Sequence, residues 1–318
     1  MKFRTEITIP QASFSISHHH KIEMIGSCFV ENISTKLKQA GFHIDINPFG
    51  ILYNPVSIGN ALVDLFLKKE YTEDDIFFFN GIYQSFSHHG RFSGVDSKQV
   101  LEKMNLQLAE SSRFIKEASA LVITFGTAKV YRLLSTGRVV SNCHKLPAKS
   151  FSHELLSVNE ITELWLERIQ QLRQINPKIC IVFTISPIRH WKDGAHDNQL
   201  SKSVLFVALN EIQRQAENTY YFPSYELLMD DLRDYRFYSE DMLHPNAQAI
   251  DYIWEKFENT YFDDTTKGLI KEWEDIQQAL NHRPFNPESE EYKNFLCTTQ
   301  QRKELFCKQH PEVNTFHH

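Results

Sequence analysis

Short apolar runs alternate with longer stretches of helical periodicity along most of the chain. Strands are predicted where apolar, β-branched and aromatic residues run together, near residues 22–25, 42–46, 120–125, 179–185 and 219–222. Between these runs, apolar residues recur at helical spacing, which predicts helices over 29–40, 56–69, 98–118, 160–175, 199–217, 224–234 and 246–258. Strands separated by helices indicate an α/β protein whose mainly parallel sheet is covered on both faces.

Helical periodicity continues beyond Asp263-Asp264, where we place a boundary between a main domain (1–262) and a C-terminal helical extension (263–318). The apolar stripe of its first helix consists of Leu269, Ile270, Trp273, Ile276 and Leu280. A second helix is predicted over 289–308. The extension is too short for a core of its own. We therefore expect it to pack on the main domain or on a partner chain, which makes it a candidate oligomer interface.

The composition narrows the class of protein. Lys and Arg total 34 against 40 Asp and Glu, a net charge of −6 with a pI near 6.2, whereas a nucleic-acid binder normally has a basic face. No apolar stretch reaches the roughly 18–20 residues that span a bilayer, and the N-terminal segment lacks the apolar core of a signal peptide. Five cysteines without a CxxC pair indicate a reduced, cytoplasmic setting.

No cofactor or metal is predicted. The chain contains neither G-x-G-x-x-G nor G-x-x-x-x-G-K-[ST], so a nucleotide site has no support. The three consecutive histidines at 18–20 do not converge well on one ion, and no matching ligand spacing accompanies them.

Two segments place reactive side chains in turns beyond the carboxyl ends of predicted strands, where open parallel sheets bind ligands. In IGSCF at 25–29, Cys28 lies near a helix N-terminus, whose dipole favours a thiolate; a small buried cysteine is the alternative. In DMLHP at 241–245, the spacing lets Asp241 reach one imidazole nitrogen of His244 while the other faces a nucleophile. A capping carboxylate beside a structural histidine is the alternative. Pro245 suits the first position of the next helix.

These motifs resemble the signature of the GSCFA-domain family, which is similar to the SGNH (GDSL-like) esterases and acyltransferases. The resemblance extends over about residues 20–260 and includes IGSCF at 25–29, NPFG at 47–50, FGTA at 125–128, NCHK at 142–145, SPIRH at 186–190, FPSYE at 222–226 and DMLHP at 241–245. It implies a three-layer α/β/α sandwich with a flavodoxin-like, mostly parallel five-stranded sheet.

The resemblance also implies a catalytic set. The G-D-S turn of SGNH enzymes corresponds to Gly26-Ser27-Cys28 here, which puts Cys28 at the nucleophile position, with His244 as the base and Asp241 orienting it. Ser27 is the alternative nucleophile if the turn is shifted by one residue. With a cysteine, the acyl intermediate is a thioester.

The SGNH oxyanion hole has three donors: the nucleophile's own N–H, a glycine N–H and an asparagine side chain. By resemblance Gly50 is the glycine candidate, but Ala128 stands where the asparagine is expected. Losing one such donor typically costs about 10²–10³ in rate. Thr127, Asn142 or His144 can replace it from nearby, and each can equally be structural.

Arg189 and His190 follow the strand at 179–185 and reach the same edge of the sheet. Either can bind an anionic substrate group such as a carboxylate or a phosphate. A solvated loop with Asp193 as a partner is the alternative.

We therefore expect an acyl-ester hydrolase or acyltransferase acting on a small-molecule or carbohydrate acyl substrate, such as an acylated carbohydrate or an envelope precursor. The alternative is a non-catalytic module that binds a carbohydrate or precursor on an esterase-like fold, which a Cys28 sulfur far from His244 would favour. Redox sensing by Cys28 is a third hypothesis, and it has no resolving cysteine close in sequence.

Overall fold

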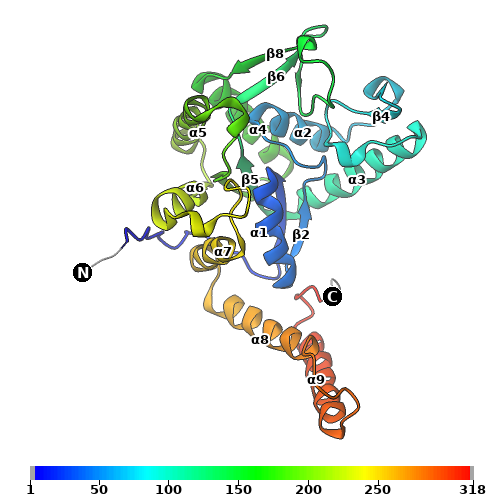
Figure 1. The fold of residues 1–318 in the computed structure, drawn as a ribbon, viewed down its shortest axis with the longest axis vertical. Coiled ribbons are helices and arrows are strands. Elements are labelled where there is room, and N and C mark those ends of the chain that lie inside the picture. Colours follow the sequence, from blue (N-terminus) through cyan, green and yellow to red (C-terminus); the bar gives the residue numbers. More distant parts are fainter. Residues whose placement is uncertain (1–3, 316–318) are drawn as a thin grey trace.

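A parallel five-stranded sheet forms the centre of the protein in a computed structural model that describes residues 4–315 (Figure 1). Its strands are β1 (Lys21–Gly26), β2 (His43–Ile46), β5 (Ala118–Phe125), β9 (Cys180–Ile185) and β10 (Thr219–Phe222). They lie in the order β10-β9-β5-β1-β2, and every neighbouring pair is parallel. This is the flavodoxin-like order, so the predicted fold class is confirmed.

Helices cover both faces of this sheet because its strands are apolar on both sides. In β5, Leu121 and Ile123 pack against one helical layer, and Ala120 and Val122 pack against the other. The first layer contains α2 (Pro55–Leu67), α3 (Ser97–Glu117), α4 (Val158–Ile175) and α5 (Ala195–Gln215). The second layer contains α1 (Cys28–Gln39) and α7 (Ala247–Tyr261).

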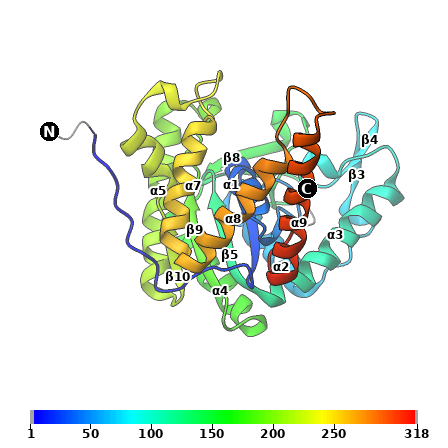
Figure 2. The same cartoon turned by 90° about the horizontal axis from the view of Figure 1, so that it is seen from below.

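The segment before β1 completes the second layer. It runs in an extended conformation past β10 and α7 (Figure 2), and Ile16 N–H donates to the carbonyl of Tyr261 at 2.7 Å. The Phe14 ring packs on Tyr220 of β10, with their centroids 4.4 Å apart. This segment therefore covers the edge of the sheet at its last strand.

Local sequence signals begin most of these helices. Ser27, Asn54 and Ser157 are N-caps whose side chains accept from backbone amides in the first turns of α1, α2 and α4. The helix predicted over 224–234 is instead α6 (Ser224–Glu226) followed by a π-helical turn (Leu227–Leu232). A π-turn has a wider hydrogen-bond spacing that helical periodicity does not reveal.

Two small antiparallel sheets were not predicted. One is the hairpin of β3 (Phe77–Phe79) and β4 (Ile82–Gln84), whose turn residues Asn80 and Gly81 both have positive φ. An Asn-Gly pair of this kind is the usual signal for a two-residue hairpin. The other sheet has the order β7-β6-β8 and contains β6 (Lys129–Leu133), β7 (Val139–Val140) and β8 (Phe151–Leu155).

The C-terminal extension projects from the main body as the helices α8 (Asp264–Leu280) and α9 (Glu290–Gln309) (Figure 1). Ile270 of α8 packs in the core of the main body, and the extension ends against the turn after α1, where Asn314 N–H donates to the Gly41 carbonyl at 2.7 Å. The domain boundary at 263 stays a prediction. Within residues 4–315, no helix is both long and apolar enough to span a bilayer.

A buried pair of carboxyl groups lies inside the sheet. Glu23 of β1 is fully buried and is paired with Asp45 of β2 in the strand register. Burial, together with the nearby Asp45, raises the pKa of Glu23 well above its usual range, and burial also raises the pKa of Asp45. Burial therefore favours the protonated form of Glu23, so the pair is more stable with one proton than as two anions.

This pair predicts a fall in stability with rising pH. The folded pKa of Glu23 exceeds the unfolded value of about 4.3, so the stability is fully present below that value and is lost as pH rises through the folded pKa. For one proton, the free energy of unfolding changes by about 1.4 kcal/mol per pH unit inside this window. Urea unfolding of Glu23→Gln should show a smaller decline than the wild type above about pH 4.5.

The control is Glu163→Gln, which alters an exposed carboxyl on α4. Its pH dependence should follow that of the wild type. Parallel curves for Glu23→Gln and the wild type would show that the Glu23 proton does not contribute.

Candidate active site

The turn after β1 places Cys28 at the reactive edge of the sheet. Gly26 lies so close to β5 that a Cβ on it would be 2.4 Å from the carbonyl oxygen of Thr124. Its N–H donates to the side chain of Asn47 at 2.8 Å, which fixes the end of β1. Because Ser27 then caps α1, Cys28 becomes the first helical residue, beyond the carboxyl end of the strand.

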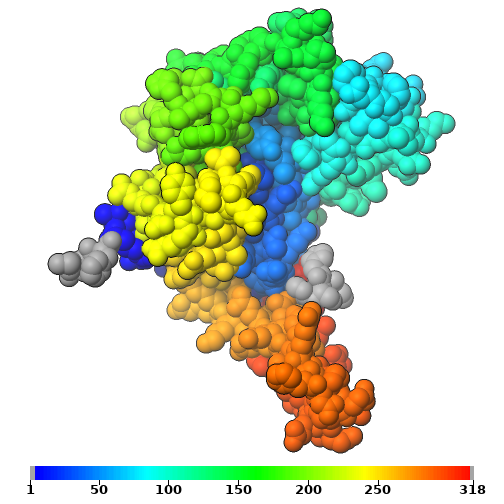
Figure 3. All heavy atoms as spheres, viewed as in Figure 1, coloured from blue at the N-terminus to red at the C-terminus, as the bar shows by residue number. Residues whose placement is uncertain are grey.

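The segment at 241–245 brings an imidazole to this cysteine. His244 Nε2 lies 3.7 Å from Cys28 Sγ, and His244 Nδ1 lies 2.5 Å from Asp241 Oδ2. The other oxygen of Asp241 accepts from the amides of Leu243 and His244. In the space-filling view, the blue surface that includes α1 meets the yellow surface of the chain before α7 (Figure 3).

Asp241 is ionised and oriented by its own turn. Hydrogen bonds from the amides of His244 and Leu243, followed by the His244 side chain, lower the pKa of Asp241 to about 2. The expected position of Pro245 was wrong, because α7 begins at Ala247 with Asn246 as its N-cap. Pro245 is instead bridged to Tyr238, so the histidine sits in a braced loop rather than on the helix itself.

Ser27 and Cys28 are in different surroundings. The Ser27 side chain is buried and accepts from the Phe29 amide at 3.3 Å, whereas Cys28 is half-buried and faces His244. Burial raises the pKa of the Cys28 thiol, although its own amide and that of Phe29 act in the opposite direction. The helix terminus therefore does not by itself make a thiolate here, and ionisation needs a base.

Lys202 is a buried cation in this site that was not predicted from the sequence. It projects from α5, is fully buried, and donates to the carbonyls of Gly126 and Ser186 at 2.7 Å each. Burial lowers the pKa of Lys202 to about 7, and the negative potential of Cys28 acts against this. Reciprocally, Lys202 favours the thiolate form of Cys28. Lys202 is in phase with the buried apolar residues of α5 (Leu205, Leu209 and Ile212), which was an available signal.

Two of the predicted oxyanion groups, Gly50 and Thr127, make hydrogen bonds within the protein. The Gly50 N–H donates to the Asn47 carbonyl at 2.7 Å, so an oxyanion would have to displace this bond. A Cβ at Gly50 would lie 2.2 Å from the Cβ of His89, which explains the glycine. The Thr127 hydroxyl lies 2.9 Å from the Ser201 hydroxyl and accepts from the Lys129 amide.

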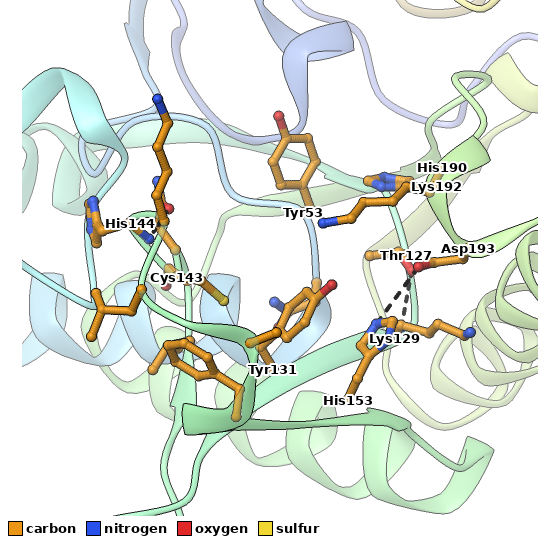
Figure 4. Close-up of a pocket in the computed structure, with 18 of the residues that line it drawn as sticks. Tyr53, Thr127, Lys129, Tyr131, Cys143, His144, His153, His190, Lys192 and Asp193 are labelled. Atoms are coloured by element: carbon orange, nitrogen blue, oxygen red, sulfur yellow. Dashed lines mark hydrogen bonds and ion pairs between the residues drawn. The ribbon is translucent and has the colours of Figure 1, made fainter.

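Asn142 and His144 are also engaged in structure. Asn142 accepts from the His144 amide at 2.8 Å, and His144 Nε2 lies 2.7 Å from the Ser85 carbonyl oxygen. Burial lowers the pKa of His144. Both residues line a cavity of about 530 Å³ beside the sheet edge (Figure 4). In it, Tyr131 stacks on His153, which in turn lies 3.9 Å from Asp193.

Tyr53 also lines this cavity. Its ring meets the edge of His190, and its hydroxyl points away from Tyr131 (Figure 4). Burial, and then the charges of Cys28 and Glu31, raise the pKa of Tyr53. Within residues 4–315 the Tyr53 hydroxyl has no hydrogen-bond partner, and its raised pKa keeps it a neutral O–H donor.

The side chains of His190 and Arg189 are in different surroundings. Burial and the nearby Lys202 lower the pKa of His190 to about 4, so this imidazole is neutral at pH 7 and does not supply the cation expected of it. Arg189 is half-buried, and its guanidinium lies 3.5 Å from Met229 Sδ. Asp193, considered as a partner for this pair, donates its N–H to the His190 carbonyl at 3.1 Å, and its carboxylate lies 3.9 Å from His153.

The surroundings of the histidine tract and of the cysteines bear on metal binding and on disulfide pairing. Across residues 4–315, no three His, Cys, Asp or Glu side chains cluster as metal ligands, and His18 Nε2 lies 2.9 Å from the Ala40 carbonyl oxygen. Cys28, Cys143, Cys180, Cys297 and Cys307 are all free thiols.

Comparison with solved structures finds carbohydrate esterases, at low identity and with TM-scores below 0.5. A family 3 carbohydrate esterase from Clostridium thermocellum is 13% identical over 79% of this chain and 98% of its own, with a TM-score of 0.35. A family 3 carbohydrate esterase from Talaromyces cellulolyticus is 10% identical over 80% and 99%, with a TM-score of 0.36. A family 2 enzyme from Corynascus thermopiles (Myceliophthora fergusii) is 12% identical over 84% and 68%, with a TM-score of 0.37. No curated protein matches the sequence.

Two family models match this chain. The C-terminal domain described for GSCFA domain proteins matches residues 273–317. The GSCFA family itself matches residues 21–257, a range that contains the Cys28 turn and the Asp241–His244 segment. The chain therefore belongs to the GSCFA family.

Proposed function

We propose that this protein is a cysteine-dependent acyl-transfer enzyme, which hydrolyses an acyl ester or passes its acyl group to an acceptor. The observation that carries this proposal is the line of contacts from the Cys28 sulfur to His244 at 3.7 Å and on to Asp241 at 2.5 Å. A nucleophile, a base and an orienting carboxylate in this order are the basic requirement of covalent acyl transfer. By family resemblance, the substrate is an acylated carbohydrate or an envelope precursor.

In the first step, Cys28 attacks the acyl carbonyl while His244 takes the thiol proton. A base is needed because burial raises the pKa of the thiol. Asp241 stays ionised and stabilises the imidazolium that forms. The alcohol leaves with the proton from His244, and a thioester remains on Cys28. Water or an acceptor, deprotonated by His244, then attacks this thioester and the thiol is restored.

The oxyanion formed in both steps needs donors, and we assign two. The amide of Cys28 is in the first turn of α1, where backbone N–H groups have no intrahelical partner. The Tyr53 hydroxyl is the second donor, since the neighbouring Leu52 N–H donates to the Gly26 carbonyl at 3.0 Å, beside the Cys28 turn, and the hydroxyl is unpartnered within residues 4–315. In this proposal Tyr53 supplies what the asparagine missing at Ala128 would supply.

Ala128 also motivates the binding module as a second candidate function. That function would be favoured by a cysteine remote from the histidine. The contact at 3.7 Å between Cys28 and His244 instead supports catalysis.

Removing the thiol should abolish acylation. An activated acetate ester is expected to add one acetyl group to the peptide containing Cys28, detected by mass spectrometry. Cys28→Ala should lose this adduct, and His244→Ala should slow its formation by about 10²–10⁴, the usual contribution of a general base. Ser27→Ala should keep the adduct while losing about 1 kcal/mol of stability through its cap.

Cys297→Ala is the matched control, since this cysteine is exposed on the distant helix α9. It should acylate at Cys28 like the wild type. Retention of the adduct by Cys28→Ala, or its loss in Ser27→Ala, would reject Cys28 as the nucleophile.

Tyr53→Phe should slow acylation by about 10², because one oxyanion donor is removed. It should leave the alkylation of Cys28 by iodoacetamide unchanged, since that displacement forms no oxyanion. Both rates are measured on the same preparation by peptide mass mapping. Equal effects on the two rates, or no effect on either, contradict the assignment of Tyr53.

Lys202→Met should slow the reaction of Cys28 with iodoacetamide near pH 7, on the order of tenfold, because a charge that favours the thiolate is lost. The pH profile of alkylation should move to higher pH, a change that loosened packing alone does not produce. Lys149→Met, at an exposed lysine, should leave the profile in place. An unmoved profile in folded Lys202→Met would exclude this electrostatic role.

A further inference from the structure

A second cavity begins at the same loop that holds the histidine. Its volume is about 590 Å³, within the range of pockets that enclose small ligands. One wall is formed by Asp241, Met242 and Leu243, the residues immediately before His244. The remaining lining residues are Arg189, Trp191, Met229, Arg233, Asp234, Tyr235 and Tyr238. We call this cavity the arginine groove.

The cations of the arginine groove lack carboxylate partners. Arg189 touches Met229 Sδ at 3.5 Å, and within residues 4–315 neither Arg189 nor Arg233 has a carboxylate oxygen within ion-pairing distance. The two carboxylates in the lining are already engaged. Asp241 is bound to His244 and its own turn, and Asp234 lies 3.5 Å from Arg236, outside the groove.

Lys202 is a third basic side chain, and its charge acts on both the thiol and Arg189. It is near enough to Cys28 and to Arg189 for each to shift its pKa, in opposite directions. Like the two arginines, it has no carboxylate partner in the described chain. Arg189, Arg233 and Lys202 are therefore three basic side chains without a carboxylate partner in the described chain.

The rest of the lining suits an organic ligand rather than a free ion. Trp191 and Met242 are each 53% exposed and Tyr235 is 74% exposed, although all three are large side chains with apolar surface. The Tyr238 hydroxyl donates to Met229 Sδ at 3.7 Å, which leaves the ring as part of the wall. Aromatic rings around an unpaired guanidinium bind planar anionic groups with an apolar body.

We propose that the arginine groove binds an anionic group, a carboxylate or a phosphate, on the substrate of Cys28, with Arg189 as its main contact. This inference rests on the proposed function, since it places the rest of an acyl substrate beside the reacting thiol. It names the substrate class as anionic esters. Neutral esters of the same size would lack the contact with Arg189.

The test uses thiol alkylation, which requires no ester turnover. N-ethylmaleimide and a maleimide bearing a terminal butyrate are compared at Cys28 by peptide mass mapping. In the wild type the carboxylate probe should be favoured, and Arg189→Met should lower its rate relative to the neutral probe by roughly tenfold. Arg189→Lys should recover part of this preference, because it restores the charge without the planar fork.

Arg236→Met is the control, since Arg236 is paired with Asp234 outside the groove, and it should keep the wild-type ratio. Arg233→Met gives a second test if Arg189→Met does not fold. Equal ratios in the wild type and both groove variants overturn the proposal, whether or not Cys28 forms an acyl intermediate.

Competition identifies the anion. Either butyrate or inorganic phosphate should protect Cys28 from the carboxylate probe in the wild type, and the one effective at lower concentration gives the natural group. Protection by neither overturns the proposal. Full protection of Cys28 in Arg189→Met would also overturn the proposal.

Discussion

The close approach of β1 to β5 at Gly26 decides where the reactive groups of this protein lie. Since no Cβ fits between Gly26 and the Thr124 carbonyl, a glycine is needed there, and Ser27 N–H then donates to the same carbonyl. That places the first turn of α1 directly over the sheet edge. The Asn47 side chain ties Gly26 to the end of β2, so two neighbouring strands fix one thiol.

The sequence was most informative where local pattern and global fold agree. The strands of the central sheet are apolar on both faces, and this reveals them without any knowledge of their partners. Cys28, Asp241 and His244 could be singled out because each lies in a short motif, and Asp241 reaches His244 within one turn. The 3.7 Å contact between Cys28 and His244 needed the fold, since 216 positions separate the two residues.

The sequence was least informative where a side chain has its role only through distant neighbours. Thr127, Asn142 and His144 are polar residues near the sheet edge, and the fold engages them in hydrogen bonds with Ser201 of α5, the His144 amide and the Ser85 carbonyl. Lys202 and Tyr53 are the opposite case, since neither was singled out from the sequence. Nothing local marks a tyrosine as unpartnered. The phase of Lys202 with the buried residues of α5 indicates its burial, but the carbonyl groups that bind it depend on which chain segments cover it.

The C-terminal extension docks at Gly41, beyond the end of α1, whereas the reactive Cys28 is the first residue of the same helix. The extension holds the end of α1 that is opposite to Cys28, and a Cβ on Gly41 would be only 2.4 Å from a methyl carbon of Val313. Twelve residues of α1 lie between the two ends, about 18 Å of helix. The contact of the extension at Gly41 therefore lies about one helix length away from the Cys28 thiol.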